Sequence, residues 1–211
     1  MSGVRERKKE ALRKRIIEAA KDCFLTDGFE ETTITTIAER ANIGVGTLYN
    51  YFPSKALLYI ESYFREMGNP QERLDQVIRK HGEDPVLTIT KIIDVYLEPY
   101  YKFEKNTLLD LLTVSLDGVS KHPELGHLYK TNKFGFVDFL AKILDAYKEK
   151  GLFSSDFEPH DAAFCVYSII TTQCLFYIID ESISYHEMQE GITRQIALFF
   201  QGKIKQRGVR K

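Results

Sequence analysis

The sequence predicts an all-α protein in which a group of short helices precedes a larger group of long ones. Apolar residues recur every three or four positions in nearly every segment, which is the spacing of one helix face. Alternating apolar and polar runs bounded by Asn-Gly or Asp-Gly turns, the signs of β-strands, are absent. A break at Gly68-Asn69-Pro70 separates the two groups, so we expect domains at 1–68 and 69–211.

The composition favours a folded, cytoplasmic protein. Hydrophobic residues make up 44% and charged residues 28% of the 211 residues, which argues against disorder. The N-terminus is polar rather than an apolar signal segment. The most apolar stretch, Phe164–Ile179, is interrupted by polar residues and is shorter than the roughly 20 residues of a spanning helix, so we expect a buried helix and no membrane. Three cysteines leave no complete disulfide framework.

Start and stop signals divide the first group into short helices. The predicted helices run from about Lys8 to Leu25, Ile34 to Ala41, Val45 to Tyr51 and Pro53 to Met67. Gly28 is typical of a residue just past a helix end, and Thr33 is a suitable N-cap. Asn42 tolerates the left-handed backbone that a tight turn between two helices needs.

The second group is expected to contain five long helices. They are predicted at about 85–103, 106–120, 124–150, 159–180 and 186–206. Breaks fall at His122-Pro123, from Gly151 to Pro159, and from Glu181 to Tyr185.

Charge is distributed unevenly along the chain, although the net charge is only −1. The segment from Met1 to Lys21 carries eight basic and three acidic residues, whereas residues 67–202 carry 13 basic and 20 acidic ones. A basic beginning and an acidic middle suit a protein that presents one end to a nucleic acid. A solvated N-terminal arm explains the same counts equally well.

Residues 33–55 have the spacing of a helix-turn-helix. Ala38 provides a small residue where two helices cross, Asn42 follows four positions later in the turn, and Leu48 follows as a core aliphatic. The second of these helices is short and polar, which suits a phosphate backbone and groove edges better than packing. Its candidate contact residues are Thr47, Tyr49, Asn50 and Tyr51, followed by Lys55.

The segment after Thr33 closely resembles the DNA-binding signature of the tetracycline-repressor (TetR) family; it reads ITTIAERANIGVGTLYNYFPSKALLY. The resemblance extends over about residues 8–66. It implies that Thr47, Tyr49 and Lys55 contact phosphates and that Thr33 touches the DNA backbone. It also implies that the major groove is faced by Val45, Gly46, Asn50 and Tyr51. The sequence departs from the family pattern where Asn42 replaces a turn glycine and Gly44 replaces a capping serine.

The same resemblance implies a homodimer whose last two long helices form a four-helix interface. The apolar residues of both helices fit this role, and burial inside the monomer is the alternative for both. The candidate dimer residues are Ala162, Val166, Ile169, Ile170, Ile192, Ile196, Phe199 and Phe200.

Aromatic residues of the second group predict a ligand pocket, with packed core as the alternative for each of them. Aromatics around a few polar groups suit a hydrophobic or flat aromatic effector, and acidic residues beside aromatics suit a lipophilic cation. The candidate lining residues are Tyr96, Tyr100, Phe103, Asp110, Phe134, Tyr167, Gln173 and Phe176.

We therefore expect a sequence-specific DNA-binding regulator, a repressor that a small molecule releases from double-stranded operator DNA. The helix from Pro53 to Met67 and the Gly68-Asn69-Pro70 junction are the expected hinge. Catalytic and metal-binding motifs such as Gly-x-Ser-x-Gly, Cys-x-x-Cys and His-Glu-x-x-His are absent, so no cofactor, metal or enzymatic activity is expected. The rival interpretations are a helical protein-interaction module with a vestigial helix-turn-helix, a small helical enzyme, and an activator in place of a repressor.

Overall fold

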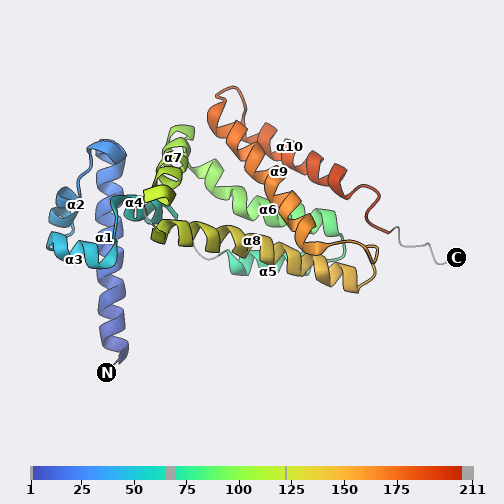
Figure 1. The fold of residues 1–211 in the computed structure, drawn as a ribbon, viewed down its shortest axis with the longest axis horizontal. Coiled ribbons are helices and arrows are strands. Elements are labelled where there is room, and N and C mark those ends of the chain that lie inside the picture. The colour runs from blue at the N-terminus through green and yellow to red at the C-terminus, as the bar shows by residue number, and fades with distance from the viewer. Residues whose placement is uncertain (1, 65–69, 122, 206–211) are drawn as a thin grey trace. The chain divides into compact units, whose positions relative to one another are not determined.

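A computed structural model describes residues 2–64, 70–121 and 123–205. The described residues are helical apart from turns, loops and one isolated antiparallel bridge between Phe153 and Ile204 (Figure 1). The helices are α1 (Ser2–Glu31), α2 (Ile34–Arg40), α3 (Val45–Tyr51), α4 (Lys55–Phe64), α5 (Gln71–His81), α6 (Pro85–Lys102), α7 (Lys105–Lys121), α8 (Pro123–Glu149), α9 (Pro159–Ile179) and α10 (Tyr185–Phe200). The all-α prediction is confirmed.

Contacts within the chain divide it into two compact units. The first unit comprises residues 1–68 and 110–127, and the second comprises 69–109 and 128–211. Helix α7 begins in the second unit and continues in the first. The assignment of domains to 1–68 and 69–211 stays a prediction, and residues 65–69 of the expected hinge lie outside the described part of the chain.

The core of the first unit is formed by the four N-terminal helices. Ile16 of α1, Ile37 of α2, Leu48 of α3 and Leu58 of α4 are fully buried. The ring of Tyr59 packs against two phenylalanines of α1, with centroid distances of 4.8 and 4.9 Å. Because the apolar residues of each helix meet at one centre, the polar sides of α2 and α3 are left at the surface.

The observed helix bounds agree with most predicted ones, and three helices differ. Helix α1 spans Ser2–Glu31 where Lys8–Leu25 was predicted, and Gly28, the predicted stop, is a kink inside it with a φ of 78°. Helix α5, which buries Leu74, was missing from the prediction. Helix α10 was predicted to continue to Gln206, but it ends at Phe200. The chain turns at Gly202, whose φ of 77° is in the left-handed region that favours glycine.

The second unit is organised around α6, α9 and α10, and α10 packs on both of the others. Gly191 of α10 allows a close approach to α9, because a Cβ at this position would lie 2.9 Å from Oε1 of Gln173. Helix α9 is the one described helix that is long and apolar enough to cross a membrane, a test that core helices of soluble proteins also pass. A third of its most apolar window is buried, so much of the helix surface is exposed.

Candidate nucleic-acid interface

The turn between α2 and α3 sets the direction of α3. Asn42 has a φ of 51°, the left-handed conformation predicted for this residue. The backbone N–H of Ile43 donates to the carbonyl of Ala38 (2.9 Å), which closes the turn directly after α2. Thr33 caps the other end of α2, where its hydroxyl accepts from the N–H of Thr36 (3.1 Å). The cap at Thr33 and the closed turn at Asn42 fix the two ends of α2, so α3 leaves the turn in a defined orientation.

Helix α3 has one buried face and one exposed face. Leu48 is fully buried, and so is Phe52, the residue that ends the helix. Val45 and Tyr49 are exposed by 37% and 49%, and Gly46 and Asn50 are exposed as well. Thr47 and Tyr51 are partly exposed at the borders of the two faces. The exposed face therefore carries the phenol of Tyr49 and the amide of Asn50, whereas Val45 and Gly46 have small side chains or none. This combination suits the floor and walls of a DNA groove.

Lys55 is engaged inside the unit. Its Nζ donates to the carbonyls of Phe29 (2.7 Å), Glu30 (3.2 Å) and Thr32 (3.1 Å), and it lies 4.3 Å from the centroid of the Phe29 ring. Phe29 and Glu30 lie in the last turn of α1, after the kink at Gly28, and Thr32 follows the helix. Because an ammonium group has three N–H donors, Lys55 in this conformation joins α4 to the end of α1. Its predicted phosphate contact stays a prediction.

Arg13 links α1 to the C-terminal end of α3. It forms a salt bridge with Glu61 of α4, and its guanidinium lies 4.9 Å from the centroid of the Phe52 ring. Neither Arg13 nor Glu61 was a predicted site residue. A salt bridge between residues 48 positions apart leaves no signal in a single sequence, because no local spacing connects the two.

The predicted pocket residues only partly come together. Phe136 of α8 lies between Tyr96 of α6 and Tyr167 of α9, with centroid distances of 4.5 and 6.2 Å. Burial raises the pKa of Tyr96. Tyr100 accepts at its carbonyl a hydrogen bond from the hydroxyl of Tyr177 (3.4 Å). Tyr96, Phe136 and Tyr167 thus form an aromatic cluster of α6, α8 and α9. The hydrogen bond between Tyr177 and Tyr100 is a separate contact of α9 with α6.

Other predicted pocket residues lie elsewhere. Phe176 is 51% exposed, and Gln173 lies against Gly191 in the contact between α9 and α10. Asp110 is exposed and groups with the first unit. Phe103 is partly exposed directly after α6, and the side chain of Phe134 lies outside the described residues. We therefore restrict the candidate pocket to the aromatic cluster.

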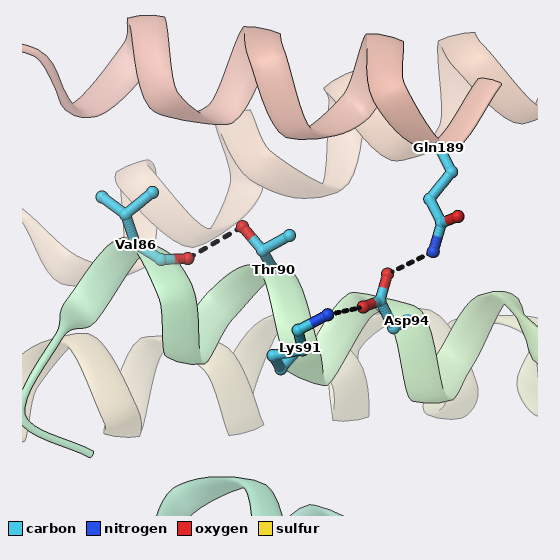
Figure 2. A network of polar contacts seen from close by, with 5 residues as sticks. All are labelled: Val86, Thr90, Lys91, Asp94 and Gln189. Carbon is cyan, nitrogen blue, oxygen red and sulfur yellow. Dashed lines mark hydrogen bonds and ion pairs between the residues drawn. The ribbon is translucent and has the colours of Figure 1, made fainter. Parts of the chain in front are cut away.

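A separate open groove lies between α6 and α10 and measures about 740 Å³. Figure 2 shows its polar network, in which Gln189 of α10 donates to one oxygen of Asp94 (2.7 Å) and Lys91 pairs with the other (2.9 Å). Thr90 is tied to its own helix by a hydrogen bond to the carbonyl of Val86 (2.8 Å). None of the predicted pocket residues lines this groove. The hydrogen bond from Gln189 to Asp94 joins α10 to α6 in this groove.

Most of the predicted dimer residues are buried within the single chain. Ala162 and Val166 of α9 are buried, and so are Ile192, Ile196 and Phe200 of α10. These five residues belong to the core of the single chain, and their part in a dimer interface stays a prediction. Ile169, Ile170 and Phe199 are partly exposed.

Part of the exposed apolar surface of the second unit lies elsewhere on the same two helices. Helix α9 exposes Phe164, Leu175, Phe176 and Ile179, and α10 exposes Leu198. Between them, the hydroxyls of Ser168 and Thr171 donate to carbonyls of their own helix, at 2.9 Å each, so that the middle of the stripe has few free polar groups. We call these five apolar residues the α9–α10 stripe.

Lys105 forms in the second unit a contact like that of Lys55 in the first. Its Nζ donates to the carbonyls of Asp180 and Ile183, both at 2.6 Å, and lies 4.5 Å from the centroid of the Tyr177 ring. These carbonyls belong to the turn between α9 and α10. Lys105 therefore fixes the first turn of α7 to that turn.

Residues 16–61 match the family described as "Bacterial regulatory proteins, tetR family". The transcriptional repressor KstR of Rhodococcus jostii is 38% identical over 92 residues, which cover 36% of this chain and 43% of that protein. The fatty acid metabolism regulator protein of Bacillus subtilis is 30% identical over 79 residues, covering 36% and 41% of the two chains. The chain thus matches less than half the length of these relatives.

Solved structures of regulators share the fold over nearly the whole chain. Thermus thermophilus FadR, a TetR-family repressor in complex with lauroyl-CoA, superposes with a TM-score of 0.68 at 22% identity, covering 94% of this chain and 98% of that one. NalD of Pseudomonas aeruginosa, a secondary repressor of a multidrug efflux pump, superposes with a TM-score of 0.64 at 18% identity, covering 93% and 98%. At these identities the likeness concerns the fold.

Proposed function

We propose, from the premise that the chain belongs to the tetR family of bacterial regulatory proteins, that it is a homodimeric repressor released from operator DNA by a hydrophobic effector. The observation that carries this proposal is the exposed polar face of α3 on a fixed helix-turn-helix whose sequence matches the family. The proposal includes a role in the cytoplasm and without catalysis, which the similarity to the transcriptional repressor KstR supports.

DNA recognition is assigned to two helices of the first unit. Helix α3 enters the major groove, where Asn50 has the amide that can pair with a base edge, while Val45 and Gly46 allow a close approach. Tyr49, Thr47 and Tyr51 hold the flanking phosphates with their hydroxyls. Thr33, at the N-terminus of α2, lies where backbone N–H groups and the helix dipole favour a phosphate.

Dimerisation is assigned to the α9–α10 stripe. Its five apolar side chains are 43 to 67% exposed in the single chain, and hydrophobic surface of this extent on a soluble protein marks a contact with another molecule. A second copy is the partner that the helix-turn-helix itself requires, because one unit of this kind reads one half-site and a twofold dimer reads two.

The effector is assigned to the aromatic cluster around Phe136. Aromatic walls suit a hydrophobic ligand, and two of the similar proteins are connected with acyl chains: one is a fatty acid metabolism regulator and the other binds lauroyl-CoA. A fatty acyl thioester is therefore the first effector class to test. Such a ligand releases DNA only if it binds the released state more tightly than the DNA-bound state.

The experiment is a salt-titrated binding measurement on DNA from upstream of the protein's own gene, with random DNA as reference. Specific binding that weakens steeply with salt supports the proposal. A Thr47→Ala/Tyr49→Ala variant is expected to show a shallower salt dependence by roughly one to two units of slope, since about 0.9 unit is lost with each phosphate contact. Equal affinity for both DNAs at every salt concentration contradicts the proposal.

Effector release is tested on the same complex with lauroyl-CoA and free coenzyme A. A fall in DNA affinity with lauroyl-CoA and not with coenzyme A supports an acyl effector. A Phe136→Ala variant should bind DNA normally and respond less to lauroyl-CoA. No response to lauroyl-CoA in the wild-type protein removes this effector class and leaves DNA binding unaffected.

A further inference from the structure

The N-terminal part of α1 extends beyond the rest of the first unit. Figure 1 shows α1 running past α2, α3 and α4 toward its N-terminus. Residues 3–11 are all exposed, and the family match begins only at residue 16. A helix rises 1.5 Å per residue, so the stretch from Ser2 to Arg13 is about 16 Å long.

One face of α1 changes from apolar to cationic along its length. Ile16, Ala20 and Cys23 recur at helical spacing and are fully buried against the other helices. The same spacing, continued toward the N-terminus, passes through Leu12 to Lys9 and Arg5. The face that packs on the unit therefore carries cations where the helix passes the edge of the unit. A solvated arm needs no such change of face.

The cationic part of α1 begins beside α3, the recognition helix that the proposal places in the major groove. Arg13, which lies over the ring of Phe52 and pairs with Glu61, is the contact that joins α1 to the end of α3. From there to the N-terminus the chain carries Arg5, Arg7, Lys8 and Lys9 against two glutamates. The positive stretch thus leaves the unit next to the C-terminal end of the helix assigned to the major groove.

We propose that residues 2–12 form a phosphate-binding arm, which contacts the DNA backbone beside the half-site read by α3 through Arg5 and Lys9. The inference rests on the proposed DNA-binding function and goes beyond it, because the arm lies outside the part of the chain that matches the family. Its partner is fixed by charge: a row of exposed cations continuous with a DNA-binding face meets a polyanion there.

The test compares two double variants of the full-length protein that remove the same charge. Arg5→Gln/Lys9→Gln changes the cationic face, and Arg7→Gln/Lys14→Gln changes the opposite face of the same helix. Salt-titrated affinity for the upstream DNA is expected to lose roughly two units of slope in the first variant, about 0.9 for each lost phosphate contact, and less than one unit in the second.

A second arm of the test shortens the DNA. A duplex that ends at the half-sites should bind the wild-type protein more weakly than one with flanking base pairs, and Arg5→Gln/Lys9→Gln should abolish this difference. Equal slopes for the two variants, or a flank effect that both variants retain, overturns the proposal. Both outcomes require a wild-type protein that binds its operator specifically. Failure of the proposed function is a different result, because the wild-type protein then shows no specific binding.

Discussion

Helices α3 and α9 both expose large side chains, but the chemistry of these side chains differs. On α3, the large exposed groups of Tyr49 and Asn50 end in a hydroxyl and an amide. On α9, the exposed groups of Leu175 and Ile179 are hydrocarbon only. Hydroxyls and amides exchange hydrogen bonds with water for hydrogen bonds with a polar partner, whereas hydrocarbon gains free energy simply by leaving water. Helix α3 therefore suits a charged, hydrated partner, and α9 suits a dry one.

The largest expected effect comes from a charge placed on α9. Leu175→Arg should convert the dimer into a monomer, because an arginine buried in an apolar interface lacks a partner. Loss of the second half-site should weaken operator binding by about 100-fold or more. Sedimentation velocity gives the mass, and the same DNA titration gives the affinity.

Leu116→Arg is the control for this variant, since Leu116 is 58% exposed on α7 and outside the α9–α10 stripe; it should remain dimeric. Cys165 offers a second readout, because it is exposed on α9 whereas Cys23 and Cys174 are buried. Burial raises the pKa of Cys174 to about 12, which keeps this thiol protonated and slow to react. A thiol reagent should thus modify Cys165 faster in the Leu175→Arg monomer. A Leu175→Arg protein that stays dimeric contradicts the assignment of the stripe.

The next effect separates two residues of α3. Asn50→Ala should weaken binding to the operator by about 1–3 kcal/mol and bring it nearer to binding of random DNA, as expected for a residue that reads a base. Tyr49→Phe, which removes one hydroxyl, should weaken binding to both DNAs alike, since phosphates carry no sequence information. Both are measured by competition between operator and random duplexes. Equal losses on both DNAs for Asn50→Ala would place Asn50 on the backbone.

The sequence predicted the first unit in more detail than the second, and the reason is physical. The turn at Asn42, the N-cap at Thr33 and the bounds of α3 are local features that depend on neighbours within a few residues. The dimer residues depend on which side of an apolar helix another helix covers. Helix α9 is apolar nearly all round, so its sequence could not separate buried Val166 from exposed Leu175. Helical spacing has no preferred face when every face is apolar.

Lys55 and Lys105, the first residues of α4 and α7, test how each unit is stabilised internally. Lys55→Met and Lys105→Met keep most of the aliphatic side chain and remove the donors to three and two carbonyls, respectively. Each partly buried contact is expected to stabilise by about 1–2 kcal/mol after allowance for solvent. Thermal unfolding should show a lower Tm for both, with the larger change for Lys55→Met. If Lys55→Met keeps its Tm but loses salt-dependent DNA affinity, Lys55 acts on a phosphate as first predicted.

The smallest expected effect concerns the start of the recognition helix. Gly44 is the N-cap of α3 and has no side-chain hydrogen bond to it. A Cβ at this position would lie 4.0 Å from the hydroxyl of Thr47, and its φ of −75° and ψ of 147° suit any residue. Gly44→Ser should therefore stabilise the protein by a few tenths of a kcal/mol, roughly the difference between these N-caps.

Gly44→Ala is the matched comparison, because it adds the same Cβ without the oxygen and should destabilise, as alanine is a poor N-cap. Chemical denaturation, analysed with one m-value for both variants, distinguishes a stabilised from a destabilised protein. If serine and alanine shift the midpoint equally, the added carbon rather than the hydrogen bond is responsible. Opposite shifts show that the side-chain hydrogen bond, and not the added carbon, sets the contribution of the N-cap to the stability of α3.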